Sequence, residues 1–62
     1  MTGYILIITI IHGSIGAVDV QRTSGYGSYE SCAVDGVARI ESQRELYPAD
    51  TELRWSCQRD GE

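Results

Sequence analysis

A chain of 62 residues makes a single domain, residues 1–62, close to the lower size limit for independent folding. Nine acidic residues against five arginines and no lysine give a net charge of −4, which argues against duplex nucleic acid and anionic membranes as direct partners, because both require clustered cations. A core of this size typically contributes only about 3–5 kcal/mol, so a covalent staple or a partner subunit is expected.

The first predicted element is a strand over residues 4–12. From Tyr4 to Ile11 the residues are apolar at both alternating positions, apart from Thr9, so a strand built from them has no solvent-facing side. The stretch is far shorter than the about 20 residues of a membrane-spanning helix. Its length also suits the apolar part of a signal peptide with a cleavage site at residues 14–17, but no cation precedes it. We therefore interpret it as a strand of the folded domain.

A second strand is predicted over residues 17–23, where apolar and polar residues alternate as in a half-buried strand. Residues 13–16 read Gly-Ser-Ile-Gly, which is turn chemistry, so the two strands are expected to form a hairpin. The glycine-rich residues 24–27 are expected to form a loop. We interpret this loop as the lead into a helix, and not as an anion-binding loop, because it lacks a lysine.

A helix is predicted from Tyr29 to about Glu45, with Ser28 as its N-cap and Glu30 in the first turn, where the helix dipole favours an anion. Apolar residues at helical spacing are assigned to the core, and they are Ala33, Val37 and Ile40, with Cys32 and Gly36 alongside. The opposite side is polar and carries Asp35, Arg39, Glu41, Ser42 and Glu45. This pattern predicts an amphipathic helix that covers one face of a sheet.

A third strand is predicted over residues 51–59, after Pro48 has ended the helix. Its apolar residues Leu53, Trp55 and Cys57 fall on one face. A right-handed crossover through the helix places this strand beside the first one, which gives an antiparallel sheet of order 2-1-3. The expected fold is α+β, a ββαβ arrangement with the all-apolar strand in the centre and one helix on one face.

The two faces of the first strand are expected to pack against different elements, one against the helix and the other against a second copy of the chain. If paired positions in the hairpin sum to 29, Val18 and Val20 share a face with the odd-numbered residues of the first strand, and we expect the apolar residues of the third strand to join them beneath the helix. The other face is then predicted to be the interface of a two-fold homodimer, formed by Tyr4, Leu6, Ile8 and Ile10. A turn longer or shorter by one residue would exchange the two sets.

Cys32 and Cys57 are both expected to face the core, as a disulfide or as buried thiols. A disulfide between them would contribute about 3 kcal/mol by closing the intervening loop. In a cytosolic protein two reduced thiols are the default state, and this is our expectation. A metal site or a catalytic Cys–His pair is not expected, because His12 lies at the distant turn, and no cofactor is predicted.

Recognition of another protein is a better expectation than catalysis. The carboxylates of the helix lie on its solvent side with nothing nearby that would tune them for acid–base chemistry. Tyrosines near the helix start suit a recognition surface. The predicted partner surface comprises Tyr26, Tyr29, Asp35, Glu41 and Glu45.

The chain resembles a class of very short proteins encoded by tailed phages and prophages. The matching residues are the aliphatic strand at 4–11, the Glu-Ser-Cys-Ala sequence at 30–33 and the Trp-Ser-Cys sequence at 55–57. Members with a known activity tend to inhibit host systems, including anti-CRISPR and anti-Hachiman proteins. The resemblance implies a non-enzymatic inhibitor in the host cytoplasm that binds a host protein. Two alternatives are a secreted or periplasmic module stapled by a disulfide, and an acidic mimic of nucleic acid.

Overall fold

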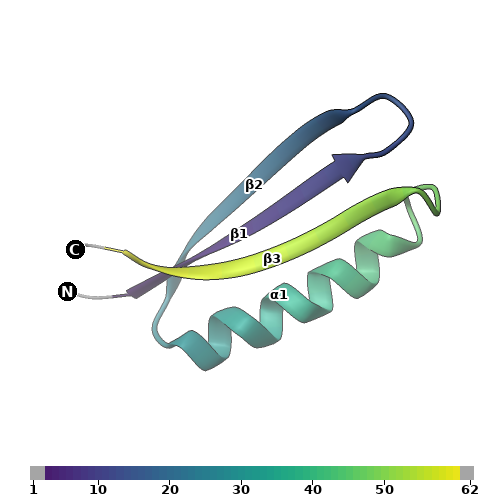
Figure 1. The fold of residues 1–62 in the computed structure, drawn as a ribbon. Coiled ribbons are helices and arrows are strands. Elements are labelled where there is room, and N and C mark those ends of the chain that lie inside the picture. The colour runs from purple at the N-terminus through teal and green to yellow at the C-terminus, as the bar shows by residue number, and fades with distance from the viewer. Residues whose placement is uncertain (1–2, 61–62) are drawn as a thin grey trace.

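The computed structural model describes residues 3–60 and contains three strands and one helix. They are β1 (Gly3–His12), β2 (Ala17–Tyr26), α1 (Tyr29–Arg44) and β3 (Thr51–Asp60). Both neighbours of β1 run antiparallel to it, and the sheet order is β2-β1-β3. Figure 1 shows the twisted sheet with α1 along one side of it. The predicted ββαβ fold, with the all-apolar strand in the centre, is confirmed.

The turn between β1 and β2 spans residues 13–16 as predicted, whereas β2 is longer than predicted. Gly16 adopts a φ of 69°, and its N–H donates to the carbonyl of His12 at 2.7 Å, which closes the turn. At the other end, β2 continues to Tyr26 through residues expected to form a loop. The pairing shifts between Tyr4 and Leu6, and Gly25 opposite this irregularity has a φ of 100°. A glycine with positive φ accommodates a bulge, so the strand continues where glycine content alone indicated a loop.

The register of β1 with its two neighbours decides which face each side chain occupies. From Leu6↔Thr23 to His12↔Ala17 the β1–β2 pairs sum to 29, as predicted. On the other side, Leu6 pairs with Cys57 and Ile8 with Trp55. The apolar residues of β3 therefore share a face with the even-numbered residues of β1, whereas the valines of β2 share a face with the odd-numbered ones.

The core lies between α1 and the even-numbered face of β1. Leu6, Ile8 and Ile10 are each at most 1% exposed, and Leu53 and Trp55 pack against them. The assignment of Tyr4, Leu6, Ile8 and Ile10 to a dimer interface is therefore wrong, because α1 covers this face and Tyr4 packs at its margin.

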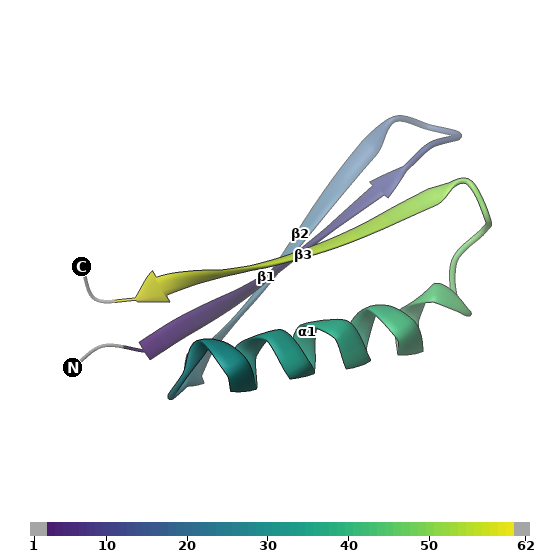
Figure 2. The same ribbon diagram turned by 60° about the horizontal axis from the view of Figure 1, so that its bottom comes forward.

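The physical reason is the position of the helix. In Figure 2 α1 runs beneath the sheet, and it packs mainly on β1 and β3, with fewer contacts to β2. The apolar side of β3 is thus the one that is covered. The apolar sides of β2 and β3 are predicted to lie on the same face of the sheet, but the observed register places them on opposite faces.

The helix buries a single narrow stripe formed by Cys32, Gly36 and Ile40, which are spaced four residues apart. A Cβ on Gly36 would lie 2.9 Å from Leu6 Cδ1 and 3.3 Å from two ring atoms of Trp55. The glycine therefore lets the helix backbone approach the sheet. Val37 was predicted to be in the core, but it lies beside this stripe and is 45% exposed.

The ends of α1 follow the predicted signals. Ser28 is the N-cap, and its Oγ accepts from the backbone N–H of Ser31 at 3.2 Å. Glu30 lies in the first turn and Arg44 in the last, which matches the preference of the helix dipole. Among residues 3–60 no helix is long and apolar enough to cross a membrane.

Candidate protein-binding surfaces

One face of the sheet has no helix over it, and its centre is apolar. We call it the open sheet face, and it comprises Ile5, Ile7, Thr9, Ile11, Val18 and Val20. The β1 residues of this set are half-buried, whereas Val18 and Val20 are 56% and 53% exposed. Apolar side chains that adjoin one another across two strands form a contiguous patch of the kind that marks an interface.

The border of the open sheet face is polar. On the β3 side, Glu52, Arg54, Ser56 and Gln58 pair opposite its β1 residues, so they point to the same side of the sheet. Arg54 Nε and Glu52 Oε2 form an ion pair. On the β2 side, Arg22 pairs with Ile7. The whole uncovered side of the sheet thus has an apolar half, the open sheet face over β1 and β2, and a polar half over β3.

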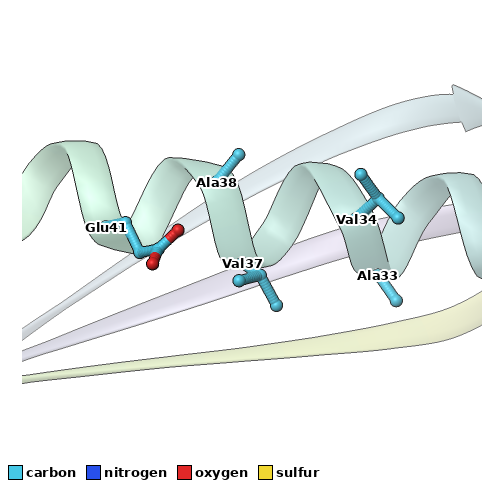
Figure 3. Close-up of a pocket in the computed structure, with 5 residues that line it drawn as sticks. All are labelled: Ala33, Val34, Val37, Ala38 and Glu41. Atoms are coloured by element: carbon cyan, nitrogen blue, oxygen red, sulfur yellow. The ribbon is translucent and has the colours of Figure 1, made fainter.

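A second exposed apolar surface lies on α1, on its outer side and its side toward β3. We call it the outer helix face, and it is lined by Ala33, Val34, Val37, Ala38 and Glu41 around a shallow, open groove of about 450 Å³. Figure 3 shows the side chains of these residues projecting from consecutive turns of the helix. Val34 is 65% exposed. This surface was not expected from the sequence, because Val37 was assigned to the core and Val34 to neither side. Their three-residue spacing, offset from Cys32, Gly36 and Ile40, is the signal that could have revealed it.

Two residues of the predicted partner surface, Tyr26 and Asp35, are half-buried and take part in a hydrogen-bond network between β2 and α1. The Tyr26 hydroxyl donates to Asp35 Oδ2, and Arg39 Nε lies 3.1 Å from the same oxygen. Arg39 in turn donates to Thr23 Oγ1 at 3.0 Å. The hydrogen bond to Asp35, and then burial, raise the pKa of Tyr26 above its usual range. This network ties the end of β2 to α1 and serves the fold.

The other three residues of the predicted partner surface are exposed but do not form one cluster. Tyr29 is at the start of α1, where its ring meets the Tyr4 ring edge-on with centroids 5.8 Å apart. Glu41 lines the groove of the outer helix face, and Glu45 is exposed at the C-cap of the helix. The structure therefore brings Glu41 and Glu45 together at one end of α1 and leaves Tyr29 at the other.

The two cysteines form a disulfide that joins the first turns of α1 to β3, with their Cα atoms 6.2 Å apart. The prediction of two reduced thiols is therefore wrong, because Cys32 and Cys57 form a disulfide. Cys32 is fully buried beside Leu6 in the core. The disulfide therefore lies within the layer of side chains between the helix and the sheet.

The polar groups in the part of the chain that the structure describes form local pairs. His12 Nε2 lies 2.9 Å from Asp19 Oδ2 across the hairpin, and its ring meets the edge of Tyr47. Residues 3–60 contain no group of three or more His, Cys, Asp or Glu side chains placed to hold a metal ion. No family model, no curated protein and no solved structure matches the chain. The features of the structure that bear on function are therefore the two apolar surfaces, the open sheet face and the outer helix face.

Proposed function

We propose that this protein is a non-enzymatic inhibitor that acts as a homodimer by binding a host protein, in the setting of phage counter-defence. The observation that carries the proposal is the open sheet face, a contiguous apolar surface on a chain of only 62 residues. In a small protein an exposed patch of this kind is typical of an interaction site. The resemblance to short phage proteins supplies the biological setting, and the host protein is the expected target.

A second copy is the occupant that fits the open sheet face by size. The whole uncovered side of the sheet includes the open sheet face and the polar residues of β3, and it consists of three strands of ten residues. With strands about 4.8 Å apart and about 3.3 Å per residue, it covers roughly 480 Å² in plan. Two such faces together bury on the order of 1,000 Å², which is about the smallest area of a stable interface. Packing two copies face to face also covers the half-exposed valines of β2 without any third component.

The distribution of polar residues also favours a symmetric pair. A two-fold axis that runs across the strands, in the plane between two sheets, places β2 over the partner's β2 and β3 over the partner's β3. The apolar half then meets an apolar half, and the polar half, with Arg54 and Ser56, meets a polar half. Arg22 lies on an edge strand, from which its charged end can reach solvent while its stem packs. This is the aligned packing of a β-sandwich.

The dimer is tested by two substitutions that add the same charge on opposite faces of β2. Val20→Glu places a carboxylate in the open sheet face, whereas Gln21→Glu places one on the helix side, where the Gln21 side chain accepts a hydrogen bond from Gln43 that a carboxylate can keep. We expect sedimentation velocity at micromolar concentration to show a dimer for the wild type and for Gln21→Glu, and a monomer for Val20→Glu. A monomeric wild type would refute the dimer.

The inhibitory activity is tested by phage plating. A host that carries an active defence system is infected with and without expression of the gene, and the gene should raise the plating efficiency. Val20→Glu should lose this effect if the dimer is the active form, while Gln21→Glu should retain it. Equal plating with and without the gene, across hosts with different defence systems, would contradict the proposed inhibition.

The disulfide favours a second candidate, a secreted or periplasmic binding module. Disulfides persist in oxidising compartments and are rare in the cytosol, so Cys32–Cys57 is unusual for a protein that acts in the host cytoplasm. Alkylation of the protein inside intact cells, followed by mass spectrometry of the whole chain, distinguishes the two. Two alkylated cysteines place it in a reducing compartment, whereas an unlabelled, oxidised chain supports the module.

A further inference from the structure

From the outer helix face we infer the kind of segment that the target supplies: a cationic amphipathic helix that lies along α1. This inference rests on the proposed function and names the chemistry of the partner. It starts from a central apolar contact of Val34 and Val37, with 65% and 45% of their surfaces exposed. Residues three apart on a helix lie on adjacent turns, and in Figure 3 the two valines project to opposite sides of the helix axis, so together they border the groove.

The groove beside the valines suits another helix. Ala33 and Ala38 flank them, and these small side chains allow a partner backbone to come near, since helices pack at about 8–10 Å between their axes. Branched or long apolar side chains one turn apart on a partner helix would fill the groove between successive turns of α1. The groove alone would accept many apolar partners, so the charges around it determine which one.

Carboxylates lie at both ends of the apolar contact. Glu30 precedes Val34 by one turn, Glu41 lines the groove, and Glu45 follows one turn later. At about 1.5 Å per residue, Glu30 and Glu41 are roughly 16 Å apart along the helix, which is three turns. In the described residues 3–60, none of these three carboxylates has an ion-pair or hydrogen-bond partner for its side chain, whereas Asp35, beside the sheet, is paired with Arg39.

The order along this stripe is therefore acidic, apolar, acidic. A complementary helix carries Arg or Lys at both ends of an apolar pair, with the cations about three turns apart. Arg44, in the last turn of α1, lines a hollow on the β3 side together with Val37 and Glu41. It offsets part of the negative charge at this end of the groove, and with three carboxylates against one guanidinium the stripe stays acidic.

The same charges argue against other occupants. A second copy of α1 would bring carboxylates against carboxylates, and unpaired like charges in an interface oppose association. Duplex nucleic acid and anionic membranes would be repelled in the same way. A cationic peptide helix gains from both the apolar contact and the charges.

The sheet-to-sheet dimer also determines where the two outer helix faces lie. Because α1 lies on the face opposite to the open sheet face, two copies packed through their sheets carry their helices on the outside (Figure 2). The two outer helix faces then point in opposite directions, and each chain takes one target helix. Binding with one peptide per chain, in a dimer and in a monomer alike, is the expected stoichiometry.

The test uses a synthetic helical peptide with two central leucines and arginines three turns apart, and a matched peptide with glutamate in place of arginine. Titration calorimetry with the oxidised, full-length protein should show binding of the arginine peptide, weakened by salt, and at least about tenfold weaker binding of the glutamate peptide. Val34→Ser should weaken binding of the arginine peptide about tenfold, and Glu41→Gln should weaken it severalfold and reduce its salt dependence.

Val18→Ser is the matched control, because Val18 is exposed to a similar extent but lies on the open sheet face. It should leave peptide binding unchanged, as should the monomeric Val20→Glu. The inference is overturned if the arginine peptide does not bind at high micromolar concentration, if both peptides bind equally, or if Val18→Ser weakens binding as much as Val34→Ser. Sedimentation and phage plating do not depend on this result, so failure of the inference is distinguishable from failure of the proposed function.

Discussion

Gly36 is the position at which the contact between helix and sheet is most sensitive to a single added atom. In Gly36→Ala the new Cβ would lie 2.9 Å from Leu6 Cδ1 and 3.3 Å from Trp55 Cδ2 and Cε3. The Leu6 side chain is fully buried and the indole ring is rigid, so neither can move far. The helix itself must then move away from the sheet.

Two opposing terms determine the size of the effect. Overpacking of a closed core costs about 1–3 kcal/mol. Alanine is favoured over glycine within a helix by about 1 kcal/mol, which offsets part of this cost. The disulfide holds Cys32, one turn before Gly36, against β3, so the helix cannot tilt away freely. We therefore expect a net loss of about 1–2 kcal/mol in the free energy of unfolding for Gly36→Ala, and a larger loss for Gly36→Val.

The assay is urea unfolding of the oxidised protein, monitored by Trp55 fluorescence at one fixed protein concentration, since dimerisation would otherwise shift the transition. Gly27→Ala is the control, because a Cβ at Gly27 has no neighbour within 4 Å and that glycine has no positive φ. It should unfold within about 0.5 kcal/mol of the wild type. If Gly36→Ala is as stable as the wild type or more stable, the close helix–sheet contact inferred here is wrong.

Two further predictions concern the covalent and polar links between helix and sheet. Replacing both Cys32 and Cys57 with serine should lower the free energy of unfolding by about 3 kcal/mol or more, and urea titrations of the wild type with and without reductant should show a shift in the same direction. Tyr26→Phe should cost about 1 kcal/mol, because Asp35 loses a donor. The pKa of Tyr26 is raised in the folded state, so its contribution is fully present below the unfolded value of about 10 and is lost as the pH rises through the folded value. Thermal melts from pH 8 to 11 should therefore show the wild type losing its advantage over Tyr26→Phe only at the alkaline end, and a constant difference would contradict this.

The order and type of the elements could be predicted because local signals agreed with one another. The aliphatic run at 4–11, the turn at 13–16, the N-cap at Ser28 and the stop at Pro48 together favour one order of elements, and the 2-1-3 sheet followed from connection rules. Which face of β1 meets the helix could not be predicted, because both faces of that strand are apolar. It depends on the β1–β3 register, a pairing between distant parts of the chain with no local signal.

The prediction of which helix residues are buried was partly wrong for a related reason. A core position is usually recognised by a large apolar side chain, so Val37 was assigned to the core, and the close approach of the helix at Gly36 was not expected. In the structure the close packing of Trp55 and Leu6 requires the residue without a side chain. The buried stripe is narrower than predicted and excludes Val37, which lies with Val34 on the outer helix face.

The position of the disulfide also affects how the chain can reach this fold. β1 pairs on one side with β2, its neighbour in sequence, and on the other with β3, near the opposite end of the described chain. In the reduced chain, Leu6 can find Cys57 only by closing a loop that contains both β2 and α1. Once Cys32 and Cys57 are joined, the path from Leu6 to Cys57 runs through Cys32 and omits most of the helix and the connection to β3. Halving a loop lowers its closure cost by about 0.6 kcal/mol. Oxidation therefore speeds the insertion of the central strand, in addition to stabilising the folded chain.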